Sequence, residues 1–88
     1  MKKIIKGVRY DTDTAKPLIR VEVSTLTHEV LYQKVNEMYF IFVDSVAGKA
    51  IRPFPGLTLA NNHRAAKAWA EEQMCVDDYE RIFGEVSE

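Results

Sequence analysis

His28, His63 and Cys75 are the residues of this chain best suited to bind a metal ion or to act in catalysis. Zinc sites use three or four Cys and His ligands in clustered spacings, and a nucleophilic cysteine needs a base placed beside it. The three residues lie in separate parts of the chain without such a pattern. We therefore expect neither a metal site nor a catalytic centre. We expect His28 on a strand surface, His63 in the first turn of a helix and Cys75 as a small, buried or half-buried residue.

Paired acids and glycines offer two other kinds of site. Asp11/Asp13 and Asp77/Asp78 carry the oxygen ligands of a divalent cation, but turn formation and helix capping explain both pairs without one. The four glycines form neither a G-x-G motif nor a Walker-type loop. We expect no bound cofactor.

Charge is divided unevenly between the two ends of the chain. Residues 1–9 hold four bases and no acid, and residues 71–88 hold seven acids and one base, although the net charge is −1. An acidic surface with an aromatic ring can dock on a basic partner, because charge raises the association rate and the ring supplies affinity. The candidate partner-binding residues are Glu71, Glu72, Asp77, Asp78, Tyr79 and Glu80.

Aromatic residues near bases suggest an alternative function, a small nucleic-acid-binding regulator. The residues concerned are Tyr10, Tyr32, Tyr39, Phe40 and Phe42, with Arg9, Arg20 and Lys34 as the bases. A platform for single-stranded nucleic acid needs two or three exposed rings on one face. We favour this alternative less, because most of these rings suit a core and phosphate contacts favour a basic protein.

The N-terminal part of the chain reads as strands. Lys3–Tyr10 is rich in strand formers, with Gly7 marking a bulge, a bend or a tight turn. Asp11–Thr14 has the short polar side chains of a turn. Leu18–Val23 alternates, which predicts a half-buried strand with Ile19, Val21 and Val23 on one face and Leu18 on the other.

The middle of the chain predicts a hairpin whose arms are Thr25–Val35 and Met38–Asp44, joined by a tight turn at Asn36-Glu37. Met38–Val43 is apolar on both faces. It therefore suits either a central strand covered on two sides or the interface of a dimerising structural module, a third alternative. Lys49–Phe54 predicts a short edge strand.

Helical spacing begins after the strands. Asn61 or Asn62 can cap a helix that runs to about Met74, with Trp69 as its anchor in the core. A second, short helix begins at Val76 or Asp77. Its apolar face holds Tyr79, Ile82 and Phe83, Gly84 is a natural stop, and a loose tail Glu85–Glu88 follows.

These elements predict a single domain, residues 1–88, of the α+β class: a small antiparallel sheet of about four strands packed against C-terminal helices. The sequence holds no apolar run long enough for a membrane span, and its start lacks the apolar region of a signal peptide. Cys75 is the single cysteine. Its lack of a disulfide partner in the chain fits a reducing cytoplasm.

Two segments resemble a family of small proteins from bacterial phages and mobile elements, mostly in Firmicutes. The start, K-K-I-I-K-G-V-R-Y-D-T-D-T-A-K, is similar to the family's opening, in which Asn precedes the glycine. The segments A-K-A-W-A-E-E-Q-M and D-D-Y-E-R-I-F-G-E are similar to its C-terminal helix pair. Lys6 departs from the family's Asn, and Ala60 stands where a capping Ser or Thr is expected. The middle, Ser24–Leu59, has no counterpart that we can place.

The resemblance implies a fold and a genetic setting more than an activity. Small phage and plasmid proteins of this size include anti-CRISPR proteins. We therefore hypothesise a non-enzymatic phage or mobile-element protein that binds and inhibits a host protein or ribonucleoprotein complex, foremost a CRISPR–Cas effector, through its acidic surface. It would act in the cytoplasm of the bacterial host.

Overall fold

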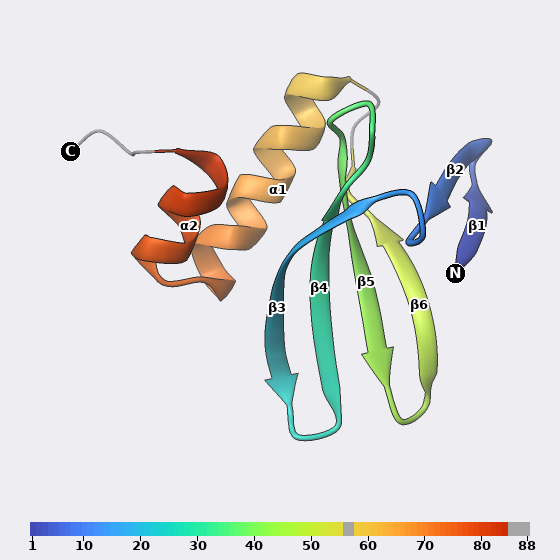
Figure 1. Ribbon diagram of the computed structural model, residues 1–88, viewed down its shortest axis with the longest axis horizontal. Coiled ribbons are helices and arrows are strands. Elements are labelled where there is room, and N and C mark those ends of the chain that lie inside the picture. The colour runs from blue at the N-terminus through green and yellow to red at the C-terminus, as the bar shows by residue number, and fades with distance from the viewer. Residues whose placement is uncertain (56–57, 85–88) are drawn as a thin grey trace.

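The computed structural model describes residues 1–55 and 58–84. It shows the predicted α+β fold, with a four-stranded antiparallel sheet in the order β3-β4-β5-β6, a separate two-stranded hairpin and two helices (Figure 1). The elements are β1 (Lys2–Ile5), β2 (Val8–Asp11), β3 (Lys16–Ser24), β4 (Thr27–Gln33), β5 (Tyr39–Ser45), β6 (Gly48–Pro53), α1 (Leu59–Gln73) and α2 (Val76–Phe83). The expected tail Glu85–Glu88 lies outside the described residues.

Lys3–Tyr10 is not the single strand predicted, but the tight turn left open at Gly7 is confirmed. The chain reverses at Lys6-Gly7, so that β1 and β2 pair with each other and Ile5 faces Val8. Both turn residues have positive φ, 51° at Lys6 and 77° at Gly7, as a two-residue hairpin turn of type I′ requires. The glycine adopts this conformation without steric cost, which is why it allowed a tight turn, but the lysine before it did not distinguish that turn from a bulge or a bend.

The turn predicted at Asp11–Thr14 is confirmed. The buried Asp11 carboxylate accepts a 2.9 Å hydrogen bond from the Asp13 backbone N–H, and the Ala15 N–H donates to the Asp11 carbonyl. The Arg9 guanidinium also pairs with the Asp11 carboxylate at 3.0 Å. The Asp13 N–H and, to a smaller extent, Arg9 lower the pKa of this carboxyl. The turn leads the chain from the hairpin into the main sheet.

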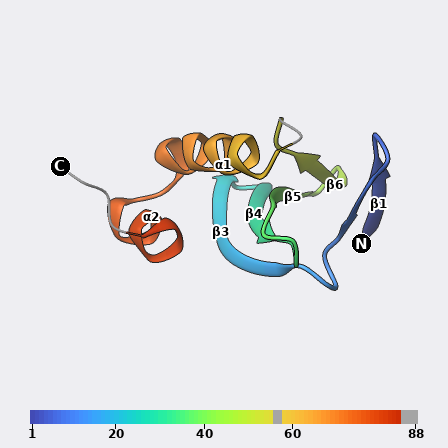
Figure 2. The same ribbon diagram turned by 90° about the horizontal axis from the view of Figure 1, so that it is seen from above.

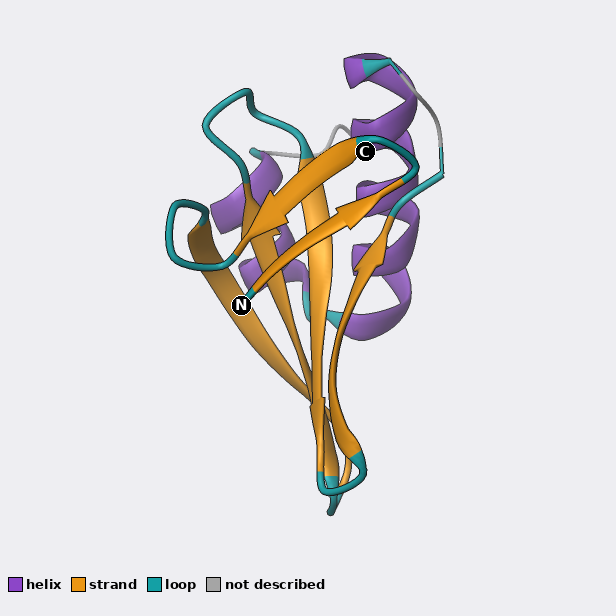
Figure 3. Ribbon diagram, turned by 90° about the vertical axis from the view of Figure 1, so that its right-hand side faces the viewer, coloured by secondary structure: helices purple, strands orange, loops and turns teal. Residues whose placement is uncertain are grey.

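Two apolar clusters lie on opposite faces of the sheet. On one face Leu31, Tyr39 and Ile41 are buried with Ala66 of α1, and we call this group the helix-side cluster. On the other face the N-terminal hairpin crosses the sheet (Figure 3), and it contributes Ile5 and Tyr10 to a cluster around the fully buried Phe40. Strand β5 thus supplies both clusters, which confirms a central strand covered on two sides. Since Tyr39, Phe40 and Ile41 are buried within the chain, they are not free to form the dimer interface considered above.

The alternation predicted along β3 fails at both of its ends. The pairing with β4 shifts between Pro17 and Ile19 and again between Glu22 and Ser24. Because the first shift inserts an extra residue, Leu18 and Ile19 both pack on the helix-side cluster. Val23, expected on the buried face, is 53% exposed.

The β4–β5 hairpin is confirmed, but its turn is not the predicted pair Asn36-Glu37. Lys34 N–H donates to the Met38 carbonyl at 2.7 Å, and Glu37 N–H donates to the Lys34 carbonyl at 2.9 Å. Three residues therefore form the loop, and the positive φ of 73° falls on Glu37. Asn36 instead accepts a hydrogen bond from Met38 N–H through Oδ1 at 3.1 Å. This is a type I turn followed by a left-handed residue.

Replacing Glu37 with glycine should raise the free energy of unfolding by roughly 0.5–1 kcal/mol, because the left-handed strain of a non-glycine residue exceeds the extra chain entropy of glycine. Urea denaturation measures the change. Asn36→Gly is the matched control, and it should destabilise the protein because it removes the bond to Met38. Stabilisation by the control, or a loss of stability with Glu37→Gly, would contradict this turn geometry.

Helix α1 begins earlier than predicted. Thr58 caps it, with Oγ1 accepting a 3.1 Å hydrogen bond from Asn61 N–H. The predicted cap Asn62 is instead buried inside the first turn, where its amide accepts from Tyr39 N–H at 2.7 Å and donates to the Tyr39 carbonyl at 3.0 Å. This pair of bonds joins α1 to the start of β5. Helix α2 begins at Val76 and ends before Gly84, as predicted.

Trp69 packs against the helix-side cluster as predicted, but it is half-buried and has a polar partner. Its indole N–H donates to Oε1 of Glu29 at 3.1 Å. The same carboxylate pairs with both terminal nitrogens of Arg52, at 3.0 and 3.1 Å. One nearly buried acid thus connects β4, β6 and α1. The short edge strand predicted at Lys49–Phe54 is confirmed as β6, which within the described residues pairs with β5 alone.

Candidate functional site

The six predicted partner-binding residues lie on the two consecutive C-terminal helices. Glu71 and Glu72 are exposed in the last turn of α1, and Asp77 and Asp78 occupy the first turn of α2. Figure 2 shows the two helices beside each other at one end of the molecule. The acids form two groups. Glu71 and Glu72 belong to α1, where Glu72 lines a groove between α1 and β6, and Asp77, Asp78 and Glu80 belong to α2.

Tyr79 connects α2 to the core. Its ring lies 5.1 Å from the ring of Phe83, which in turn lies 5.4 Å from the ring of Tyr39. Ile82 and Phe83 pack on the helix-side cluster, so the predicted apolar face of α2 is confirmed. Tyr79 itself is half-buried at the edge of this face. The acids on either side of it, Asp78 and Glu80, are therefore carried by an anchored helix.

Ion pairs are more common among the acids outside the C-terminal helices than among those on them, although Asp13 and Glu37 also have no ion pair within the described residues. Asp11, Glu22, Glu29 and Asp44 each have a basic partner within 4 Å. Of the acids on the helices, Asp78 pairs with Arg81 at 3.4 Å. The structure gives no ion pair among residues 1–55 and 58–84 for the other four, which are Glu71, Glu72, Asp77 and Glu80. Arg64 and Lys67 match the two acids of α1 in number, whereas α2 holds Asp77, Asp78 and Glu80 against Arg81, so the excess of negative charge lies on α2.

The aromatic side chains of the alternative nucleic-acid surface are engaged inside the protein. Tyr39 and Phe40 are buried. Tyr32 stacks on Phe40 at 5.3 Å and meets Phe42 edge-on, and Tyr10 meets Phe40 edge-on at 5.4 Å. Tyr10, Tyr32 and Phe42 are half-buried. This face does not present the two or three exposed rings that a stacking platform needs.

The structure keeps His28, His63 and Cys75 apart. His28 lies on a strand, β4, as predicted, but it is half-buried, with Nε2 3.4 Å from the Asp44 carboxylate. His63 lies one turn further into α1 than predicted, because the helix begins at Leu59, and its Nε2 is 2.8 Å from the Glu37 carbonyl. Cys75 is exposed, contrary to prediction, since it is the residue before α2 in a short connection. The described part of the chain holds no cluster of three metal-binding side chains.

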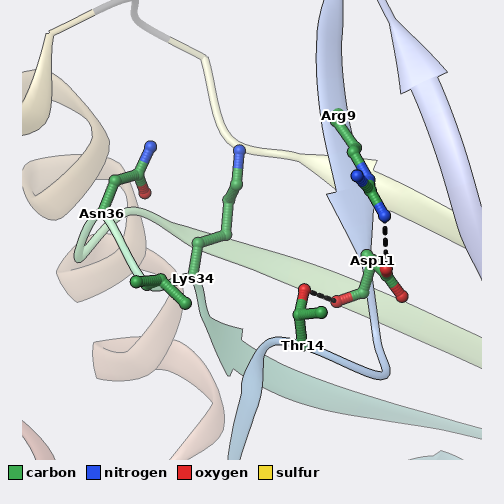
Figure 4. Close-up of a pocket in the computed structure, with 6 residues that line it drawn as sticks. Arg9, Asp11, Thr14, Lys34 and Asn36 are labelled. Carbon is green, nitrogen blue, oxygen red and sulfur yellow. Dashed lines mark hydrogen bonds and ion pairs between the residues drawn. The ribbon is translucent and has the colours of Figure 1, made fainter.

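A groove that the sequence did not indicate lies between the N-terminal hairpin and the loop after β4 (Figure 4). It has a volume of about 420 Å³ and is lined by Arg9, Asp11, Thr14, Lys34, Val35 and Asn36. Lys34 is half-buried, and burial lowers the pKa of its ammonium group. In the sequence, Arg9 and Lys34 stood out only as bases near Tyr10. We expected them to serve a platform of aromatic rings that stacks on nucleic-acid bases.

Comparison with models of known families, with curated proteins and with solved structures finds no match to this chain. Neither of the helices in residues 1–55 and 58–84 has the length and apolar character required to cross a membrane.

Proposed function

We propose that this chain is a non-enzymatic binding protein that docks the acids of α1 and α2 on a basic surface of a host complex and so inhibits it. The foremost candidate is the nucleic-acid channel of a CRISPR–Cas effector. The observation that carries the proposal is the excess of acid on α2, where Asp77 and Glu80 have no ion pair within the described residues. Glu71 and Glu72 of α1 have no ion pair there either. A channel that binds phosphates presents the complementary charge.

The fixed geometry of α2 supports this proposal. Ile82 and Phe83 hold the helix on the core, so little backbone conformational freedom is lost when its acids meet a partner. Tyr79 lies at the edge of the same face, and tyrosines are enriched among the residues that dominate binding energy. The acids around it would steer association and the ring would add contact affinity.

The resemblance to phage and mobile-element proteins supports the genetic setting. The family places Asn before the glycine that corresponds to Gly7, and Asn-Gly is the pair preferred in a type I′ turn. This chain makes a turn with positive φ at both positions, Lys6 and Gly7. The same turn in the family would account for this difference between Lys6 and the family's Asn.

Charge reversal on α2 tests the proposal. The double variant Asp77→Lys/Glu80→Lys should weaken binding to a purified effector complex by at least about tenfold, mostly through slower association, since the charges act at long range. Surface plasmon resonance at two salt concentrations and a DNA-cleavage assay measure binding and inhibition. Binding by the unaltered protein should weaken as salt is raised.

The matched control is Asp13→Lys/Glu22→Lys, which makes the same change in net charge on exposed residues away from the helices. This control should bind and inhibit like the unaltered protein. Equal loss in both double variants would show that net charge alone matters. Unchanged binding by a folded Asp77→Lys/Glu80→Lys variant would refute the acidic-helix mechanism.

A further inference from the structure

The groove between the N-terminal hairpin and the β4–β5 loop joins segments that lie far apart in the sequence. Arg9 comes from β2, Thr14 from the following turn, and Lys34 and Asn36 from the loop after β4 (Figure 4). The groove is separate from α1 and α2, so what it binds is independent of the function proposed above. A volume of about 420 Å³ is large enough for a small molecule and not merely for a single water.

Lys34 supplies the central positive charge. Its ammonium nitrogen lies 4.7 Å from the centre of the Tyr10 ring, a cation–π contact that holds the side chain in place. Within the described residues no carboxylate lies within 4 Å of this nitrogen. A half-buried ammonium without a counter-ion is destabilised, and an anion placed beside it would offset that cost.

Asn36 adds a hydrogen-bond donor of known orientation. Its Oδ1 accepts from the Met38 backbone N–H at 3.1 Å. A backbone N–H can only donate, so this bond identifies which end of the amide is the oxygen. The amide nitrogen of Asn36 is consequently left to donate to another group.

Asp11, the acid that lines the groove, already accepts hydrogen bonds at both carboxylate oxygens. Oδ2 of Asp11 accepts from Arg9 and Oδ1 accepts from Asp13 N–H. Arg9 uses one of its terminal nitrogens in that pair, its side chain is 61% exposed, and a guanidinium has five N–H donors. The groups still able to bind a ligand are therefore donors and cations: Lys34, Asn36 and Arg9.

We propose that this groove binds the oxyanion of a small molecule, a phosphate or carboxylate group, between the Lys34 ammonium, the Asn36 amide nitrogen and the Arg9 guanidinium. The groove has two cations and one committed acid, so a bound anion brings the local charge close to balance. Charge-assisted hydrogen bonds from Lys and Arg to such oxygens are among the strongest in proteins.

Nuclear magnetic resonance of the ¹⁵N-labelled protein tests this proposal. Inorganic phosphate and acetate are titrated separately at constant ionic strength, set with sodium chloride. At least one of them should shift the backbone amides of Lys34 and its neighbours saturably, with a Kd on the order of 1–10 mM. Tighter binding of phosphate would identify a phosphate ligand, and tighter binding of acetate would identify a carboxylate ligand.

Two variants check the assigned contacts. Lys34→Met retains an apolar stem over Tyr10 without the charge, and Asn36→Asp retains the acceptor for Met38 N–H while replacing the donor with a negative charge. Each should weaken binding at least about tenfold, whereas Lys49→Met, at an exposed lysine of β6, should not change it. Chemical-shift dispersion reports whether each variant is folded. Absence of saturation with both anions up to about 50 mM, or undiminished binding by folded Lys34→Met, would overturn the proposal.

Discussion

Truncating Phe40 to alanine should lower the free energy of unfolding by about 3–5 kcal/mol, the usual cost of removing a fully buried phenylalanine. Phe40 is completely buried, and it contacts the rings of Tyr10 and Tyr32. It forms the centre of the cluster between the main sheet and the β1–β2 hairpin. The total stability of small domains lies near the lower end of roughly 5–15 kcal/mol. Much of the fold's stability therefore depends on this residue.

Urea denaturation measures the loss, and amide hydrogen exchange shows where it falls. The hairpin should lose protection together with the rest of the sheet, since Ile5 and Tyr10 pack on the same cluster. Val46→Ala, at a side chain that is 77% exposed, is the control and should change stability by no more than about 0.5 kcal/mol. A loss below about 1 kcal/mol for Phe40→Ala would mean that the hairpin does not cover this face.

Replacing Glu29 with alanine should lower the free energy of unfolding by roughly 2–4 kcal/mol. The change removes one hydrogen bond and a second ion-pair contact from Arg52, and one hydrogen bond from the Trp69 indole. Hydrogen bonds to charged groups contribute about 1.5–3 kcal/mol each, but Arg52 is half exposed and regains water when its partner is lost. The net cost is therefore smaller than the sum of the separate interactions.

The exposed pair Arg20–Glu22 provides a comparison. Both side chains are more than 60% exposed at a separation of 3.1 Å, so Glu22→Ala should cost less than about 1 kcal/mol. Trp69 is the one tryptophan of the sequence, and its fluorescence should change in Glu29→Ala and not in Glu22→Ala. Equal effects of the two substitutions on stability would contradict the role assigned to Glu29.

Local sequence patterns predicted the helices and strands whose apolar residues recur at regular spacing. The β4–β5 hairpin, the edge strand β6 and both helices could be recognised because apolar spacing and stop residues agree there. The central position of β5 also follows from its apolar residues on both faces. Errors fell where the backbone at one or two residues decides the path of the chain. Gly7 left a bulge, a bend or a tight turn open, and no residue of the sequence marked the bulge at Leu18.

The candidate sites show the same division. Sequence located the acids of α1 and α2, because charge and position along a helix are local properties. It did not show which acids have ion-pair partners, since Glu29 meets Arg52 and Trp69 across large separations in the chain. The groove at Lys34 was missed for the same reason. Its residues come from two stretches, 9–14 and 34–36, that only the fold brings together.

The sequence by itself determined the fold class, the central strand and the excess of acid at the C-terminal helices, because periodicity and composition act over a few residues. Tertiary structure decided that a hairpin covers the second face of the sheet, that Asn62 binds β5 and does not cap α1, and which charges are compensated. Those outcomes depend on which residues far apart in the sequence come into contact. These tertiary contacts set the burial and pairing of polar groups, and no local pattern of residues encodes them.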